Sequence, residues 1–178
     1  GDYTPYAQTS VTTGPVTEIT TPPNMLRWDP IAVPGKPVDF IDGLITIAAN
    51  GNAMGQYGMG IHLYAINRSM QNRYFYCADG ELLFIPEQGE LLLRTECGPL
   101  HLKVGEIAVI PRGIKFAVDL LHQTARGYVC ENYGTPFVLP ERGPVGANGY
   151  ANDRDFICPC ASYEDIDQEM ELLCKFAG

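Results

Sequence analysis

Short apolar or alternating runs recur along the middle of the chain, and turn residues separate them. Gly80, Gly89, Gly98, Gly105 and Gly113 lie between these runs. Alternation of apolar and polar residues with period two is typical of a half-buried strand, and no long segment shows the 3.6-residue period of an amphipathic helix. The pattern therefore predicts an all-β fold built from antiparallel strands. The predicted strands are Ile61–Ile66, Leu82–Ile85, Leu91–Arg94, Leu100–Val104, Ile107–Ile110, Phe116–Leu120 and Tyr128–Tyr133.

The two ends of the chain lack this regular pattern. Residues 1–24 are rich in Thr and Pro, which predicts an extended N-terminal arm rather than a domain. Residues 25–140 form the predicted barrel, and residues 141–178 follow as a Gly/Asn-rich loop and a C-terminal segment. In that segment Ser162-x-x-Asp165 fits a capping box that opens a helix, whereas Met170–Phe176 partly alternates as a strand does. Both interpretations stay open, and the absence of a terminating motif at Gly178 indicates a longer protein.

Glycine is dense between Gly51 and Gly60, a composition shared with phosphate-binding loops. Such a loop needs Lys-Ser or Lys-Thr after its last glycine, and a helix whose N-terminus faces the phosphates. Here Ile61–Tyr64 continues as a strand instead. We therefore predict a hairpin or an interface loop.

Composition excludes several classes of protein. The 178 residues are 46% hydrophobic and 19% charged, which is enough to bury a core and excludes a disordered chain. The formal net charge of −9 disfavours nucleic acid and anionic membrane surfaces as partners. No apolar run approaches the roughly 20 residues of a membrane-spanning helix. The first residues of the sequence, Gly1–Pro5, lack the basic-then-apolar pattern expected of a secretory signal. The six cysteines lack a Cys-x2-Cys pair and are interpreted as reduced thiols, so we predict a cytoplasmic protein.

The spacing Gly105-x5-Pro111-x-Gly113 matches a turn skeleton of cupin β-barrels. In the cupin pattern a metal-binding histidine follows on the next strand and points into the barrel, but that position is Phe116 here. Gly89 would close the upstream half of the pattern, whose ligand positions contain neither His nor Glu. The sequence therefore predicts a cupin-like antiparallel β-sandwich or jelly-roll barrel whose interior is filled by apolar side chains. We expect no metal ligand and no cofactor in this chain.

Few residues of this sequence suggest chemistry. An iron site of two histidines and one carboxylate would need two of His62, His101 and His122 to converge with an acidic residue, and their spacing argues against it. Each is expected to be a surface or hydrogen-bonded structural histidine. Aromatic residues in the predicted barrel are candidates for lining a pocket, with core packing as the alternative. These candidates are Tyr74, Tyr76 and Phe116.

The segment 143–156 combines glycines with amide and charged side chains between hydrophobic flanks. Its side chains can form the hydrogen bonds that hold a defined loop. No nucleophile and base accompany it, so a structural or interface loop is favoured over a catalytic one. The residues assigned to this role are Gly146, Asn148, Gly149, Asn152, Arg154 and Asp155.

Several strings of the chain, read together, resemble the homogentisate 1,2-dioxygenase family. They are Asn24–Trp28, Val38–Leu44, Ile110–Phe116, Gly143–Phe156 and Tyr163–Asp165, in the order that the family shows. The resemblance implies an enzyme that uses Fe(II) and dioxygen to open the ring of homogentisate, giving maleylacetoacetate in tyrosine and phenylalanine catabolism. It also implies trimers that pair into hexamers. The family's iron ligands belong to a C-terminal domain beyond Gly178, so none is assigned to this chain.

The resemblance makes this chain the N-terminal scaffold and oligomerisation region of such an enzyme, inactive by itself. The alternative is a stand-alone, metal-free cupin-like protein that binds a small organic molecule. An open reading frame that continues into a segment with the His and Glu ligands would favour the dioxygenase.

Overall fold

The structure is a computed structural model that describes residues 4–6, 9–16, 23–25, 27–144 and 150–177. These residues form ten β-strands and one 3-10 helix, η1 (Asp153–Asp155). The fold class is all-β, as predicted. The strands are β1 (Leu44–Asn52), β2 (Tyr57–Ile66), β3 (Arg73–Cys77), β4 (Glu81–Gln88), β5 (Leu91–Thr95), β6 (Gly98–Leu102), β7 (Ala108–Ile110), β8 (Phe116–Leu120), β9 (Ala125–Asn132) and β10 (Glu171–Lys175).

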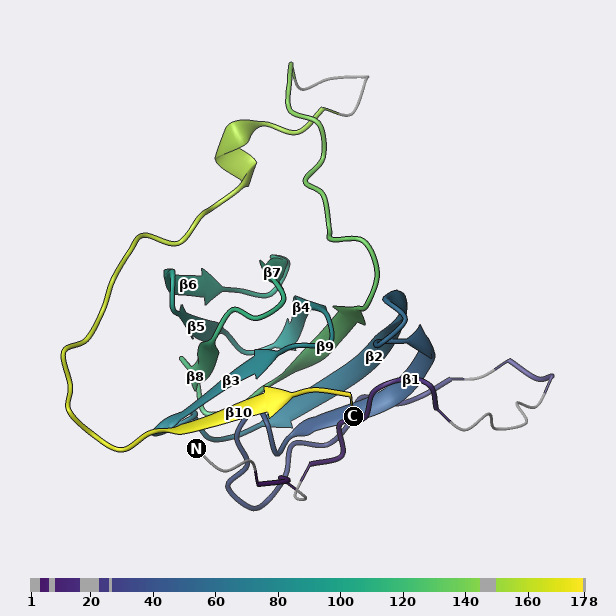
Figure 1. Ribbon diagram of the computed structural model, residues 1–178, viewed down its shortest axis with the longest axis horizontal. Helices are drawn as coiled ribbons and strands as arrows, with labels where there is room; N and C mark the ends of the chain where they lie inside the picture. Colours follow the sequence, from purple (N-terminus) through teal and green to yellow (C-terminus); the bar gives the residue numbers. More distant parts are fainter. Residues whose placement is uncertain (1–3, 7–8, 17–22, 26, 145–149, 178) are drawn as a thin grey trace.

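The strands form two sheets that pack face to face (Figure 1). The first, sheet A, has the order β1-β2-β9-β4-β7, and the second, sheet B, has the order β10-β3-β8-β5-β6. Strands β2 to β9 alone give the two four-stranded sheets of a jelly roll. All pairs are antiparallel except β10, which pairs with β3 in parallel.

All seven strands predicted from the apolar runs are present, with ends shifted by a few residues. Turn glycines explain why the runs end where they do. Gly105 and Gly113 have φ angles of +91° and +84°, in a region that side chains with a Cβ rarely adopt. The glycine-rich stretch forms the predicted hairpin between β1 and β2.

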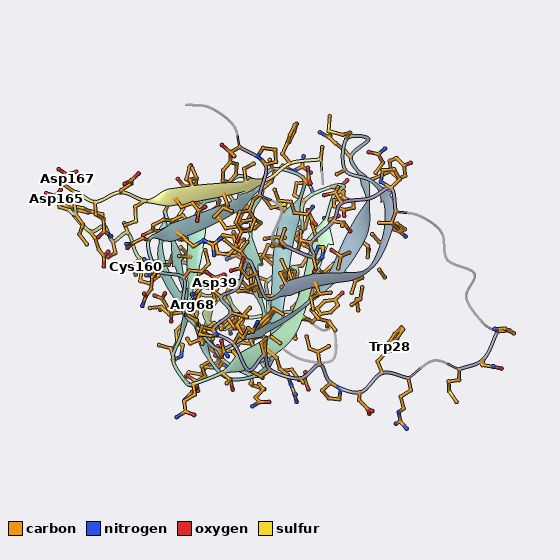
Figure 2. All side chains as sticks on the ribbon, turned by 90° about the horizontal axis from the view of Figure 1, so that it is seen from below. Trp28, Asp39, Arg68, Cys160, Asp165 and Asp167 are labelled. Atoms are coloured by element: carbon orange, nitrogen blue, oxygen red, sulfur yellow. The ribbon has the colours of Figure 1, made fainter. Side chains whose placement is uncertain are left out.

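The C-terminal segment resolves one open question. Residues 162–170 contain no helix, and the alternating part forms β10, so the helical interpretation is wrong. A tertiary contact decides the outcome, because Leu173 is buried against the core once β10 pairs with β3. The segment that leads to β10 runs outside the two sheets, and Asp165 and Asp167 on it lie away from the barrel (Figure 1 and Figure 2).

The N-terminal arm lies along the free edge of β1. Ser10 forms a parallel bridge with Ile45, and the Thr12 N–H donates to Thr46 Oγ1 at 2.8 Å. The arm therefore covers the edge of sheet A that is not paired with β2. The residues that the structure describes include no helix long and apolar enough to cross a bilayer.

Candidate functional site

The place of the cupin metal ligand is filled by an aromatic cluster. Phe116 on β8 is completely buried, and its ring centroid lies 5.7 Å from those of Phe75 and Phe84 at interplanar angles of 89° and 88°. The ring of Phe40 lies 6.0 Å away. Edge-to-face contacts at these distances are favourable, and the rings offer no atom that binds iron. These residues therefore do not fit a ferrous ion.

No group of three or more His, Cys, Asp or Glu side chains is arranged to hold a metal ion within the described part of the chain. The residues that carry charge inside the barrel instead contact one another. We call this set the buried ionic network, and it consists of Thr13, His62, Cys77, Asp79, Glu131 and Lys175.

Lys175 stands at the centre of the buried ionic network. Only 4% of its side chain is exposed, and Nζ lies 2.9 Å from Asp79 Oδ2 and 2.9 Å from Glu131 Oε1. It also donates to the Thr13 hydroxyl, which in turn donates to Asp79 at 2.6 Å. Because all three ammonium hydrogens have an acceptor, the buried charge is fully satisfied. The ring of Tyr133 lies 5.8 Å from Nζ and adds a cation–π contact.

Glu131 connects Lys175 to the middle of sheet A. Its carboxylate accepts from Cys77 Sγ at 2.9 Å and lies 2.8 Å from His62 Nε2. The other ring nitrogen of His62 lies 2.9 Å from Thr46 Oγ1, whose own hydrogen is directed to the Thr12 carbonyl. His62 therefore links Glu131 on β9 to Thr46 on β1 across sheet A.

The network shifts the pKa values of its members. Burial alone would raise the pKa of the Glu131 carboxyl, but the His62 hydrogen bond and the charge of Lys175 hold it below its ordinary value. Burial also raises the pKa of the Asp79 carboxyl. Hydrogen bonds from the Ala177 N–H and the Thr13 hydroxyl more than offset this effect, so the pKa of Asp79 is lowered overall. For Lys175 burial lowers the pKa, and the negative charge of Glu131 more than offsets this.

These shifts predict how stability depends on pH. A carboxyl whose pKa is lowered on folding contributes stability above its unfolded value of about 4, and this stability is lost as the pH falls through the folded value. Lys175, whose pKa is raised, loses its contribution only in alkali. We therefore expect the urea concentration at half-unfolding to decrease as the pH is lowered below about 4. In the Glu131→Gln variant this decrease with pH should be smaller. Urea denaturation at a series of pH values measures it.

Glu164→Gln is the control for this series, because Glu164 is exposed on the segment that leads to β10. It should keep the acid dependence of the unchanged protein. A Glu131→Gln variant with that same dependence would show that the network contributes nothing to acid stability.

A second polar cluster ties the arm and β10 to the barrel near the surface. Arg73 on β3 donates to Asp39 at 2.7 Å, to Glu171 at 2.7 Å and to the Tyr6 hydroxyl at 2.8 Å. The Tyr6 hydroxyl donates to Asp42. One guanidinium therefore connects the arm, the turn before β1 and the last strand.

An open cavity of about 790 Å³ lies between the arm and β10, and Phe40, Ile41, Phe75 and Leu173 are among its apolar lining residues. Of the three residues expected to line a pocket, Tyr76 borders this cavity. Phe116 lies in the core instead, because its strand points it between the sheets. Tyr74 lies on the outer side of sheet B, where its hydroxyl accepts from Arg94 at 3.0 Å. Sequence reasoning did not separate these three environments.

The remaining histidines meet at the surface. His101 Nε2 lies 2.7 Å from Glu90 Oε2, and His122 Nε2 lies 3.7 Å from the other oxygen of the same carboxylate. The hydrogen bond from His101 is the main reason that the pKa of Glu90 is lowered. Spacing along the chain gave no sign that these two histidines share a partner.

The loop residues singled out from the sequence fall into two groups. Asn152 Oδ1 accepts the Arg154 N–H at 3.1 Å, and Asp155 Oδ2 accepts the Asn152 N–H at 3.0 Å, so they form a capping box around η1. These hydrogen bonds fix the backbone of η1, and the role of the wider segment as a structural or interface loop stays a prediction. The other three lie outside the described residues: Gly146, Asn148 and Gly149.

The buried ionic network was not predicted from the sequence, although one signal was available. In β9 the inward positions are Ala125, Gly127, Val129 and Glu131, so a glutamate occupies a position that its strand directs into the core. A charge at such a position requires a buried partner. The partner, Lys175, lies on β10, and its position depended on the segment that the sequence left open between helix and strand.

Solved structures with cupin folds are similar to parts of this chain. A cupin-2 domain protein from Shewanella frigidimarina NCIMB 400 is 20% identical with a TM-score of 0.37, over 42% of this chain and 70% of that one. A cupin superfamily protein from Desulfitobacterium hafniense DCB-2 is 11% identical with a TM-score of 0.42, over 56% of this chain and 83% of that one. These similarities are weak, and the jelly-roll arrangement of this chain rests on the strand order of its two sheets.

A match to a protein family covers nearly the whole sequence. Residues 2–178 match the family described as homogentisate 1,2-dioxygenase N-terminal. The strings that resembled this family in the sequence, from Asn24 to Asp165, all lie inside the matched range. The chain therefore belongs to the homogentisate 1,2-dioxygenase N-terminal family.

Proposed function

We propose that this chain is the non-catalytic scaffold region of an Fe(II)-dependent dioxygenase that opens the ring of homogentisate to maleylacetoacetate. Family membership supports the reaction, and the proposal places the iron ligands in a part of the enzyme outside residues 1–178. The observation that carries the scaffold role is the position of Phe116, packed against Phe75 and Phe84 where a cupin ligand would stand.

The scaffold role is further supported by the way in which both ends of the chain are fixed to the barrel. Lys175 connects β10 to Thr13 of the arm through the buried ionic network. Arg73 connects Glu171 at the start of β10 to Tyr6 of the arm. A segment that follows β10 would therefore start from a strand held at both ends, which fixes its direction relative to the barrel. The proposal also assigns subunit assembly to this region and a cytoplasmic location to the enzyme, since the six cysteines are free thiols.

Oxygen uptake tests the proposal that this chain is a scaffold and that the reaction takes place in another part of the enzyme. With homogentisate and ferrous iron, the isolated 178-residue chain is expected to consume no more oxygen than iron alone. The complete gene product is expected to consume oxygen only when homogentisate is present and to release a ring-opened product. Homogentisate-dependent oxygen uptake by the isolated chain would place the reacting residues inside the barrel and refute the proposal.

The cavity between the arm and β10 favours a second role, the binding of a small organic molecule without a metal. Its lining combines the rings of Tyr6, Phe75 and Tyr76 with the apolar side chain of Leu173. Saturable binding of a small aromatic acid, with chemical-shift changes at these residues, would support it.

A further inference from the structure

Two cysteines that are far apart in the sequence come together at the turn between β5 and β6. The turn consists of Glu96 and Cys97, and Gly98 begins β6. A Cβ atom placed on Gly98 would lie 1.9 Å from the carbonyl oxygen of Cys160, so the backbone of Cys160 lies directly against Gly98. In Figure 2 Cys160 lies at the edge of the barrel, whereas Asp165 on the same segment lies farther out.

This contact depends on glycine at position 98. The φ angle of Gly98 is +120°, which residues with a Cβ rarely adopt, and a side chain there would collide with the Cys160 carbonyl. The segment on the other side of the contact, residues 156–170, contains no helix or strand. Its position beside sheet B is therefore set by local contacts such as this one.

The turn holds Cys97 in a defined position. The Cys97 N–H donates to Thr95 Oγ1 at 3.1 Å, and the Thr95 hydroxyl donates to the Gly98 carbonyl at 2.6 Å. Glu96 accepts the N–H of Lys115 at 2.9 Å, which fixes the turn to the start of β8. Cys97 is thus presented by a rigid element to a segment without regular structure.

The distance between the two cysteines suits a covalent bond. A disulfide joins residues whose Cα atoms lie about 4.4–6.8 Å apart, and neighbouring Cα atoms along a chain are about 3.8 Å apart. Cys97 is the chain neighbour of Gly98, the residue that Cys160 contacts. Both are exposed free thiols. A small movement of residues 156–170 is enough to bring the sulfur atoms together, because no helix or strand holds that segment back.

The other cysteines are not placed to replace Cys160. Cys77 is buried, and Cys130 and Cys174 are partly buried on β9 and β10. Cys158 is exposed, but it lies two residues before the contact, about 7 Å away along an extended chain. Cys158 is therefore the matched comparison for Cys160.

We propose that Cys97 and Cys160 are a modification site at which hydrogen peroxide introduces a reversible disulfide. Peroxide oxidises one thiol to a sulfenic acid, and one molecule of water is released. The second cysteine attacks the sulfenic sulfur as its thiolate, the S–S bond forms, and the leaving hydroxide takes up the thiol proton as a second water. Two electrons thus pass from the two thiols to the peroxide. A dithiol reductant restores both thiols by exchange.

The disulfide would fasten the segment that leads to β10 to the opposite edge of sheet B. The order of this sheet, β10-β3-β8-β5-β6, places β10 at one edge and β6 at the other. Oxidation would therefore connect the two edges through residues 161–170, and reduction would release them. This site goes beyond the scaffold role and does not depend on the homogentisate reaction.

Peptide mapping of the 178-residue chain tests the site. After peroxide treatment the free thiols are alkylated and the chain is digested with trypsin without reductant. Cys97 then lies in the peptide 95–103 and Cys160 in the peptide 155–175, so the disulfide joins these two peptides. The joined pair is expected in the oxidised chain and should separate with dithiothreitol.

Two serine variants identify the partner of Cys97. Cys160→Ser should lower the yield of the joined pair at least about 10-fold, because the remaining thiols lie outside disulfide distance. Cys158→Ser is the matched control and should keep the yield within about two-fold. Both positions are exposed, and circular dichroism confirms that each variant keeps its strands. A yield that persists in Cys160→Ser would overturn the proposal.

A non-reducing denaturing gel and a digest of unfolded protein complete the test. The oxidised chain is expected at the mass of a single chain, and a disulfide found only between two chains would overturn the proposal. Oxidation in concentrated urea should give less of the joined pair, because unfolding separates the two segments. An equal yield in urea, or no joined pair in the folded chain, would show that the fold does not bring Cys97 and Cys160 together.

Discussion

Replacing Lys175 by methionine is expected to lower the free energy of unfolding by about 3–5 kcal/mol, the usual effect of removing one partner from a buried ion pair. Methionine keeps most of the volume but removes the cation that Asp79 and Glu131 share, each at 2.9 Å. Both carboxylates would then be buried without their main compensating charge. Urea denaturation of the variant and the unchanged protein at neutral pH measures the loss.

Lys115→Met provides the matched control for this experiment. Lys115 is also paired with a glutamate, Glu96 at 3.3 Å, but 47% and 41% of the two side chains are exposed. Pairs of this kind contribute about 0–1 kcal/mol. If Lys175→Met costs no more than Lys115→Met, the buried ionic network does not hold the last strand and the arm to the barrel.

Replacing Phe116 by alanine is expected to cost a similar amount, about 3–5 kcal/mol, because it leaves a cavity in a packed core. Phe116 is completely buried and contacts Phe40, Phe75 and Phe84. If the interior were an open binding chamber, the neighbouring rings would already face empty space, and the substitution would remove few contacts. Chemical denaturation therefore reports directly on how solid the interior is.

Phe137→Ala is the comparison, since Phe137 lies beyond β9 and is 38% exposed. Surface substitutions of this kind usually change stability by less than about 0.5 kcal/mol. A Phe116→Ala variant as stable as Phe137→Ala would contradict a filled barrel.

Much of the barrel could be predicted because its strands carry their own signals. In β9, Ala125 and Val129 point inward while Arg126 and Asn132 point outward, so the period of two is visible in the sequence, and Glu131 is the exception at an inward position. Strand β1 was not predicted. After Thr46 it contains Ala48, Ala49 and Asn50, which have low strand propensity, and its place is set by pairing with β2 and the arm.

The polar interior could not be predicted, for a different reason. A charged residue at an inward position indicates that it has a buried partner, but it does not indicate which residue that partner is. Thr13, Asp79 and Lys175 come together only through the closure of the two sheets, and Thr13 and Lys175 are 162 positions apart in the sequence. The position of Phe116 was easier to predict from the sequence, because the turn from Gly105 to Gly113 fixes where the next strand begins.

Equilibrium dialysis of the purified 178-residue chain against ferrous iron under anaerobic conditions is the most direct test of the claim that the barrel is a filled, non-catalytic scaffold. The account predicts that the dialysed chain retains no more iron than a buffer blank, because phenylalanine rings occupy the ligand positions. Retention of one tightly held ferrous ion per chain would contradict it.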